Sequence, residues 1–180
     1  TADADVVAKA DRIVLPGVGA FEACMDALSA IDGMEDALET RVLGQSHPFL
    51  GICVGMQLMA EYGTETIDRS ELRAIDGLSW IAGSVVPIKP AKNLKIPHMG
   101  WNEIIPVGKS SLIERGEAYF LHSYAYECGQ WPSAVRAVTD HGGEVVAAIQ
   151  EDTAIGVQFH PEKSQAYGIN FLKRFLEWSP

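Results

Sequence analysis

The sequence predicts an α/β fold, with a single domain over residues 1–180 and a twisted, mixed and mostly parallel sheet flanked by helices. In the first half, short apolar runs at residues 12–15 and 48–52 are each followed by a segment compatible with a helix. Strands that alternate with helices are typical of a parallel sheet. In the second half, short β-like runs between turn residues indicate further strands, some of them antiparallel. The length is typical of one domain.

Composition excludes several classes of function. The chain is 47% hydrophobic and 21% charged, with a net charge of −10 and no basic run, which argues against a nucleic-acid partner. It has no apolar stretch of membrane-spanning length and does not open on a signal peptide, so we expect no membrane partner. Its three cysteines lack metal-ligand spacing. We therefore expect neither a metal nor a cofactor, and a reducing cytoplasmic location.

The first strand ends at a glycine-rich loop. A short helix is expected after Asp3, and a buried strand over residues 12–15 is expected to stop where Pro16 interrupts its ladder. The loop Gly17, Val18 and Gly19 follows. It is either an ordinary connection, which these residues alone favour, or a loop whose backbone N–H groups face an anion. Residues 21–43 then have helical periodicity, broken near Gly33.

The next strand leads into a turn that contains a cysteine. Cys53 lies between Gly51 and Gly55, which is the spacing of a strand-to-helix nucleophile elbow. Small residues are needed on both sides of so sharp a turn, and a helix N-terminus favours a thiolate. We expect the helix to run to about Tyr62. The alternative is a buried, inert cysteine after a core strand.

The second half is expected to be rich in strands. The β-like runs are residues 80–88, 95–105, 119–121, 134–139, 145–149 and 154–159. Turn signals separate them, among them residues 129–132 and a hairpin signal around Gly142. Residues 165–177 have helical spacing and are expected to close the domain.

A histidine and a carboxylate follow the last predicted strand. His160 and Glu162 are two residues apart, and Pro161 between them favours extended backbone at the histidine. In an extended segment both side chains point to the same side, where the carboxylate orients the imidazole. With Cys53 they supply a nucleophile, a general base and an orienting group. The alternative for His160 is a surface histidine at a strand end.

At this point the chain resembles the class I glutamine amidotransferases. Three segments carry the resemblance: PGVGAF at residues 16–21, GICVGMQL at residues 51–58 and VQFHPEKS at residues 157–164. The resemblance covers nearly the whole chain, and the three motifs together are highly specific. It implies glutamine as the substrate and hydrolysis to glutamate and ammonia.

The resemblance also implies the role of each catalytic residue. The Cys53 thiolate attacks the side-chain amide of glutamine, His160 protonates the leaving ammonia and then activates water, and Glu162 orients His160. Backbone N–H groups hold the oxyanion. These donors are expected from Val54 and from the loop of Gly17, Val18 and Gly19.

Four further residues match family positions that hold the substrate. By resemblance, Gln57 and Glu65 bind the amino-acid head group of glutamine, and the backbone of Ser123 and Tyr124 contacts it. The alternative for Gln57 is a solvated helix residue. For Glu65 it is an ordinary surface charge.

Within the class, residues 95–102 and 120–124 resemble glutaminase subunits of imidazole glycerol phosphate synthase, which acts in histidine biosynthesis. Such a subunit is usually a heterodimer with a (β/α)₈-barrel cyclase, to which the ammonia passes. The expected interface residues are His98, Met99, Gly100, Trp101, Asn102 and Lys163. The alternative for Trp101 is a core position at a strand start.

Family members open with an additional β-α unit, and Thr1 falls about one such unit later. We therefore expect the sheet to lack the family's first strand and to present an apolar edge.

Two alternatives for function stay open. One is the glutaminase of another amidotransferase, for pyridoxal phosphate or nucleotide synthesis, against which residues 95–102 argue. The other is a non-catalytic scaffolding subunit.

Overall fold

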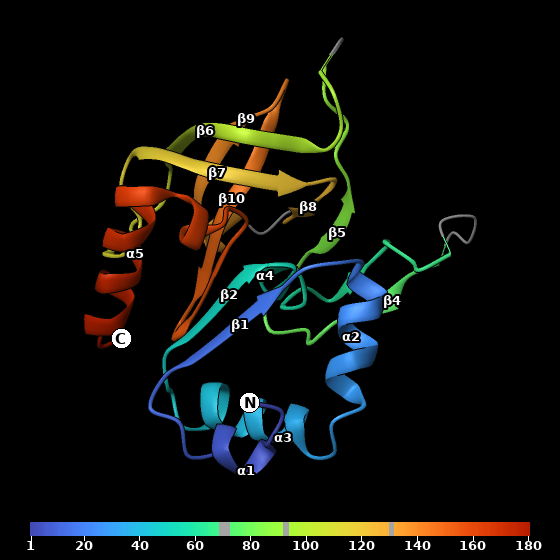
Figure 1. Cartoon of the computed structure of the whole chain (residues 1–180), viewed down its shortest axis with the longest axis vertical. Helices are drawn as coiled ribbons and strands as arrows, with labels where there is room; N and C mark the ends of the chain where they lie inside the picture. The colour runs from blue at the N-terminus through green and yellow to red at the C-terminus, as the bar shows by residue number, and fades with distance from the viewer. Residues whose placement is uncertain (69–72, 92–93, 130–131) are drawn as a thin grey trace.

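A computed structural model describes residues 1–68, 73–91, 94–129 and 132–180, and within them the strands form two sheets (Figure 1). The larger sheet has seven strands in the order β1-β2-β11-β10-β9-β6-β7. They are β1 (Ile13–Gly17), β2 (Phe49–Cys53), β6 (His98–Pro106), β7 (Gly116–His122), β9 (Val135–Asp140), β10 (Glu144–Glu151) and β11 (Ala154–Val157). The smaller sheet has the order β4-β3-β5-β8. Its strands are β3 (Tyr62–Gly63), β4 (Ile75–Asp76), β5 (Ser84–Pro87) and β8 (Tyr124–Glu127).

The predicted α/β fold with a mixed sheet is confirmed, but the expectation of a mostly parallel sheet is wrong. Only β1–β2 and β2–β11 pair in parallel within the larger sheet, and its remaining pairs are antiparallel. The second half of the chain turns back tightly, as at the predicted hairpin around Gly142, and tight turns can join only antiparallel strands. Gln130 and Trp131 of the other predicted turn lie outside the described residues.

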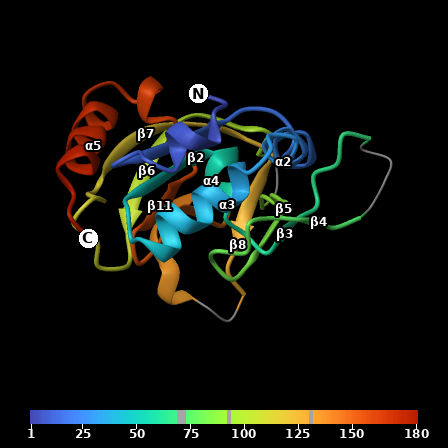
Figure 2. The same ribbon diagram turned by 90° about the horizontal axis from the view of Figure 1, so that it is seen from below.

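The helices other than the one after Cys53 lie in two separate places. Asp3 caps α1 (Ala4–Val7), and the predicted break at Gly33, whose φ is 70°, separates α2 (Phe21–Ser29) from α3 (Met34–Glu39). A π-helical turn, Thr40–Gly44, follows. These helices gather near β1 and β2, whereas α5 (Gln165–Glu177), which has the predicted bounds, packs beside β7 (Figures 1 and 2).

The two parallel strands β1 and β2 end together. Gly17 is in register with Cys53, which brings the glycine loop to the cysteine turn, as expected for the carboxyl ends of adjacent parallel strands. Pro16 does not end the ladder, because it pairs with Ile52. In the described structure β1 pairs only with β2, and proline is tolerated on such an edge strand.

The helix after Cys53 is much shorter than predicted. It comprises α4 (Val54–Gln57), and Tyr62 belongs to a strand. The carbonyl groups of Leu58, Met59 and Ala60 accept hydrogen bonds from backbone N–H groups of residues 78–81. Tertiary contacts therefore take the acceptors that a longer helix would need.

The chain passes from one sheet to the other beside the cysteine turn. Only Ser123 separates β7 in the larger sheet from β8 in the smaller one.

No helix in the described part of the chain is both long and apolar enough to cross a bilayer.

Candidate active site

Cys53 occupies a strained turn between β2 and α4. Its φ of 54° and ψ of −110° are rare for a residue with a side chain, and such strain is typical of nucleophile elbows. All five residues of β2 are buried, and Cys53 is the last of them, so it lies at the end of a core strand. The sharp strand-to-helix turn that the sequence predicts at Cys53 is confirmed.

The flanking glycines are required by backbone packing. A Cβ atom at Gly51 would lie 2.5 Å from the carbonyl oxygen of Gly55, and one at Gly55 would lie 1.9 Å from the carbonyl oxygen of Leu15. Both contacts are with backbone, which cannot move aside cheaply. The Gly-x-Cys-x-Gly spacing therefore lets α4 pack directly onto β1 and β2.

The start of α4 favours the Cys53 thiolate through the Val54 N–H, as expected, but burial outweighs this effect. Burial, with smaller contributions from Glu162 and Cys24, raises the pKa of Cys53 to about 11, although hydrogen bonds from the Val54 N–H and Gln158 lower it. The single turn of α4 cannot outweigh the loss of water around the sulfur. Cys53 is therefore a neutral thiol near pH 7.

A hydrogen bond to Glu162 orients the His160 ring. Its ring is buried, and its Nδ1 lies 2.8 Å from Oε1 of Glu162. Because a carboxylate only accepts, Nδ1 carries the proton, and Nε2 is left as the basic nitrogen. Glu162 reaches the ring through a 3-10 turn, Pro161–Lys163, and not through the extended segment that was predicted.

These residues meet at a small cavity of about 170 Å³. Cys53 and His160 both contribute to its wall, together with most of the residues expected to hold the substrate or the oxyanion. The other lining residues are Val18, Gly19, Val54, Gln57, Glu65, Leu121, His122, Ser123, Tyr124 and Lys163. Segments far apart in the sequence thus build one site at the carboxyl ends of β1 and β2.

Gln57 is buried, so the alternative of a solvated helix residue is wrong. Its Nε2 donates to the carbonyl oxygen of Tyr124 at 3.1 Å and to Oε1 of Gln158 at 3.0 Å. The other head-group candidate, Glu65, accepts a hydrogen bond from the N–H of Phe21 at 3.3 Å. Glu65 therefore links the cavity to the start of α2.

Val18 and Gly19 of the glycine loop line the same cavity as Tyr124 of β8. Val18 is 80% exposed, and its carbonyl oxygen accepts a hydrogen bond from the thiol of Cys24 at 3.6 Å. Gly19 has a φ of 120°, a conformation that favours glycine. Gly17 belongs to β1. Ser123 also lines the cavity, and its carbonyl accepts from the N–H of Ile88 at 2.9 Å.

Comparison with known proteins matches the class I glutamine amidotransferase family over residues 2–178. The chain is 53% identical to imidazole glycerol phosphate synthase subunit HisH of Zymomonas mobilis, over all of this chain and 82% of that protein. It is 48% identical to the HisH subunit of Rhodopseudomonas palustris, over all of this chain and 84% of that protein. The chain belongs to the class I glutamine amidotransferase family, among the HisH subunits.

Solved structures agree on the amidotransferase fold. A crystal structure of a glutamine amidotransferase matches 98% of this chain and 83% of its own, with a TM-score of 0.69 and 15% identity. The structure of PurLQS from Thermotoga maritima matches 93% of this chain and 79% of its own, with a TM-score of 0.61 and 16% identity. At these identities the likeness supports the fold alone.

Next to the cavity, whose wall includes Leu121, β6 and β7 present an apolar surface. Met99 is in register with Leu121, and Trp101 with Tyr119. Met99 is 63% and Trp101 48% exposed, so the alternative of a core tryptophan is wrong. Lys163 Nζ lies 5.9 Å from the ring centroid of Tyr119. We call Met99, Trp101, Tyr119 and Leu121 the β6–β7 face.

His98 was predicted at the same interface, but its side chain is buried and cannot contact a partner directly. It lies in a chain of hydrogen bonds. Nδ1 of His122 faces the carbonyl oxygen of Tyr124 at 2.8 Å, so this nitrogen is the donor. His122 Nε2 then accepts from His98 Nδ1 at 3.0 Å, and His98 Nε2 accepts from Asn102 Nδ2 at 3.1 Å. Both imidazoles are satisfied when neutral.

The expected interface positions Gly100 and Asn102 lie on β6 beside this chain of hydrogen bonds. Gly100 has a φ of 128°, and a Cβ atom there would meet nothing within 4 Å. Asn102 also donates to the carbonyl oxygen of Asp140 at 2.7 Å. Asn102 therefore ties β6 to the end of β9.

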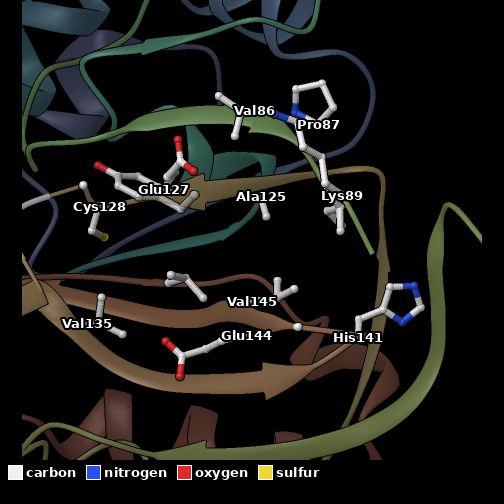
Figure 3. A pocket seen from close by; sticks show the side chains of 15 residues that line it. Val86, Pro87, Lys89, Ala125, Glu127, Cys128, Val135, His141, Glu144 and Val145 are labelled. Carbon is white, nitrogen blue, oxygen red and sulfur yellow. The ribbon is translucent and has the colours of Figure 1, made fainter. Parts of the chain in front are cut away.

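A larger cavity, of about 360 Å³, lies between β5, β8 and β10 (Figure 3). Burial raises the pKa of its cysteine, Cys128, to about 11. Figure 3 shows His141 at the opposite end of the cavity from Cys128, so the two do not form a nucleophile and base pair. The chemistry of this amidotransferase is therefore expected at the smaller cavity.

Sequence reasoning missed three polar residues around the site: Gln158, Ser164 and His122. Ser164 is buried, donates to the carbonyl oxygen of His160 at 2.7 Å and accepts from the N–H of Tyr119 at 2.9 Å. It thereby ties the His160 turn to β7. Gln158 and Ser164 flank His160 within the VQFHPEKS motif. A glutamine next to an apolar strand indicates a buried polar side chain that needs hydrogen-bond partners, and this signal could have identified Gln158.

Proposed function

We propose that this chain hydrolyses glutamine to glutamate and ammonia at Cys53, with His160 as general base and acid and Glu162 as the orienting group. The observation that carries this proposal is the shared cavity. The strained Cys53 elbow and the imidazole paired with Glu162 open onto the same small space. Family membership supports the same chemistry.

The neutral thiol defines the first step. His160 Nε2 accepts the Cys53 proton as the sulfur attacks the amide carbon of glutamine, because a free thiolate is scarce at this pKa. His160 then gives this proton to the leaving nitrogen, and ammonia departs from the glutamyl thioester. Water attacks the thioester with His160 as base, which releases glutamate and restores the thiol. Val54 and the loop of Gly17, Val18 and Gly19 supply the oxyanion donors.

Glutamine would be held by Gln57, Glu65, Ser123 and Tyr124. Both N–H groups of Gln57 are engaged, and its Oε1 is buried with no hydrogen-bond partner among the described residues. An N–H group of the bound substrate would satisfy this oxygen. The carboxylate of Glu65 suits the α-ammonium group of glutamine.

We further propose that the β6–β7 face docks a (β/α)₈-barrel cyclase, which receives the ammonia for imidazole glycerol phosphate formation in histidine biosynthesis. The support is the exposed apolar surface and the word "subunit" in the names of the HisH relatives. Lys163 lies next to Glu162 and near Tyr119, and would bring partner contact close to the triad. A heterodimer in the cytoplasm is expected, and the three free cysteines suit a reducing compartment.

The test is glutamate release with and without the cyclase and its nucleotide ligand. We expect low activity alone, strong stimulation in the complex, and loss of activity in Cys53→Ala. High activity alone that the partner leaves unchanged would contradict the docking proposal. Glutaminase activity that persists in Cys53→Ala would exclude this cysteine as the nucleophile.

A further inference from the structure

Two buried glutamine side chains, Gln57 and Gln158, form a chain of contacts that ends at the Cys53 sulfur. Gln158 is fully buried, and the carbonyl oxygen of Ala147 on β10 accepts its backbone N–H at 2.9 Å. Its side-chain Nε2 lies 3.6 Å from Sγ of Cys53. Its Oε1 lies 3.0 Å from Nε2 of Gln57. The two amides thus connect the cysteine sulfur to the wall of the substrate cavity.

A backbone carbonyl fixes which way both amides point. The oxygen of Tyr124 can only accept, so the end of Gln57 that faces it must be the NH₂ group. The same NH₂ group contacts Gln158, so the facing atom of Gln158 must be its oxygen. Consequently the NH₂ group of Gln158 is the end that faces Cys53. Reversing either amide would bring two donors or two acceptors together.

A donor in this position favours the anionic form of the sulfur. A hydrogen bond to a charged acceptor is about twice as strong as one between neutral groups, so the contact strengthens when the thiol loses its proton. It acts against burial and the charge of Glu162, both of which raise the pKa of Cys53. Because water is largely excluded from the site, few other groups can donate a hydrogen bond to the thiolate.

We propose that Gln158 stabilises the Cys53 thiolate with its amide N–H, and that the Tyr124 carbonyl sets this orientation through Gln57. The inference rests on the proposed role of Cys53 as nucleophile and adds a residue to that site. Because Gln57 also lines the cavity, a change in its hydrogen bonds on substrate binding reaches the sulfur through a single intervening side chain.

The test measures the thiol and does not depend on turnover. Alkylation of Cys53 by iodoacetamide would be followed between pH 7 and 10.5, with peptide mass spectrometry to separate Cys53 from Cys24 and Cys128. In Gln158→Leu the loss of the donor is expected to raise the pKa of Cys53 by about 1, which lowers the alkylation rate roughly tenfold at pH 8. Gln158→Glu, which is nearly isosteric, is expected to act in the same direction, because its carboxylate faces the sulfur.

Gln45→Glu is the matched control. Gln45 is exposed and precedes β2, at the opposite end of that strand from Cys53, and the substitution adds the same charge. The control should leave the alkylation profile unchanged. A role for Gln158 in packing alone predicts a lower melting temperature in Gln158→Leu with an unchanged profile. That result, or a Gln158→Glu profile that overlays the wild type, would overturn the inference.

Turnover by the complex with the cyclase separates this inference from the proposed function. We expect Gln158→Leu to lower kcat for glutamine more than it raises KM, because the donor acts on the sulfur as it loses its proton to His160 and not on the bound substrate. If the alkylation profile is unchanged while Cys53→Ala abolishes glutaminase activity, Gln158 lacks this role and the nucleophile assignment holds. If Gln158→Leu raises the pKa while Cys53→Ala stays active, the thiolate contact holds and the nucleophile assignment fails.

Discussion

Nδ1 of buried His160 lies 2.8 Å from Oε1 of Glu162, whose side chain is 53% exposed. The contact determines which ring nitrogen carries the proton, and so leaves Nε2 unprotonated, as the proposed role of His160 as base requires. Because water reaches Glu162, the contribution of this pair to stability is small, and its main effect is on the tautomer.

Glu162→Gln should impair catalysis with little effect on substrate binding. The amide can donate to Nδ1, which places the imidazole proton on Nε2 and removes the base. We expect kcat to fall by roughly 10²–10⁴-fold, the range of general acid–base catalysis, with KM changed by less than about threefold. Steady-state kinetics of the complex with the cyclase measures this. Glu162→Asp should retain more activity than Glu162→Gln, and the reverse order would argue against a tautomer effect.

Gly55→Ala should destabilise the fold. A methyl group there would overlap the carbonyl of Leu15, and overpacking against backbone costs about 3 kcal/mol. For a chain of this size the melting temperature should fall by roughly 6–12 °C. Gly44→Ala is the control, because a Cβ atom at Gly44 meets only Glu39 O, at 4.0 Å. Equal melting temperatures for the two variants would contradict the packing argument.

Stability should fall as the pH drops from about 6.5 to about 4. Burial lowers the pKa of His98 to about 4, helped by the charge of His141. Burial also lowers the pKa of His122 to about 3, and His98, His141 and His160 add to this against the hydrogen bond to Tyr124. The unfolded chain binds protons near pH 6.5 that the folded chain does not, so each histidine contributes a slope of up to about 1.4 kcal/mol per pH unit.

Urea unfolding at pH 7.5, 5.5 and 4.5 measures this dependence. Carboxylates elsewhere contribute as well, so the comparison is with His98→Phe, which should have a shallower slope between pH 6.5 and 4. Identical slopes would show that His98 does not remain neutral in the folded chain. Above about pH 7 neither histidine should affect the pH dependence.

Trp101→Ala should weaken cyclase binding without unfolding the chain. A half-exposed tryptophan in an apolar patch is typical of an interface hot spot, worth about 2 kcal/mol, or roughly 30-fold in Kd. Calorimetry with the purified cyclase would measure the change. Leu176→Ala on α5 is the control, because Leu176 is 63% exposed and lies outside the β6–β7 face. Equal affinities for both variants would place the docking surface elsewhere.

Much of the fold followed from local patterns. The bounds of α5 and the break at Gly33 match the predictions, because periodicity and a glycine signal act over a few residues. The length of α4 and the balance of parallel and antiparallel pairs could not be predicted in this way. They depend on hydrogen bonds from residues 78–81 and on the order of strands in space.

Residue types and their spacing along the chain were enough to indicate the kind of chemistry. Cys53 between two glycines and His160 two residues before Glu162 are arrangements of near neighbours, and chain geometry alone brings each group together. The protonation and hydrogen bonding of these groups depend on how the chain packs in space. The neutral thiol of Cys53 results from burial, and the donor that Gln158 points at it depends on Gln57, which is 101 residues away in the chain. Proton affinity and hydrogen-bond direction are set by all neighbours in space, which a linear motif does not specify.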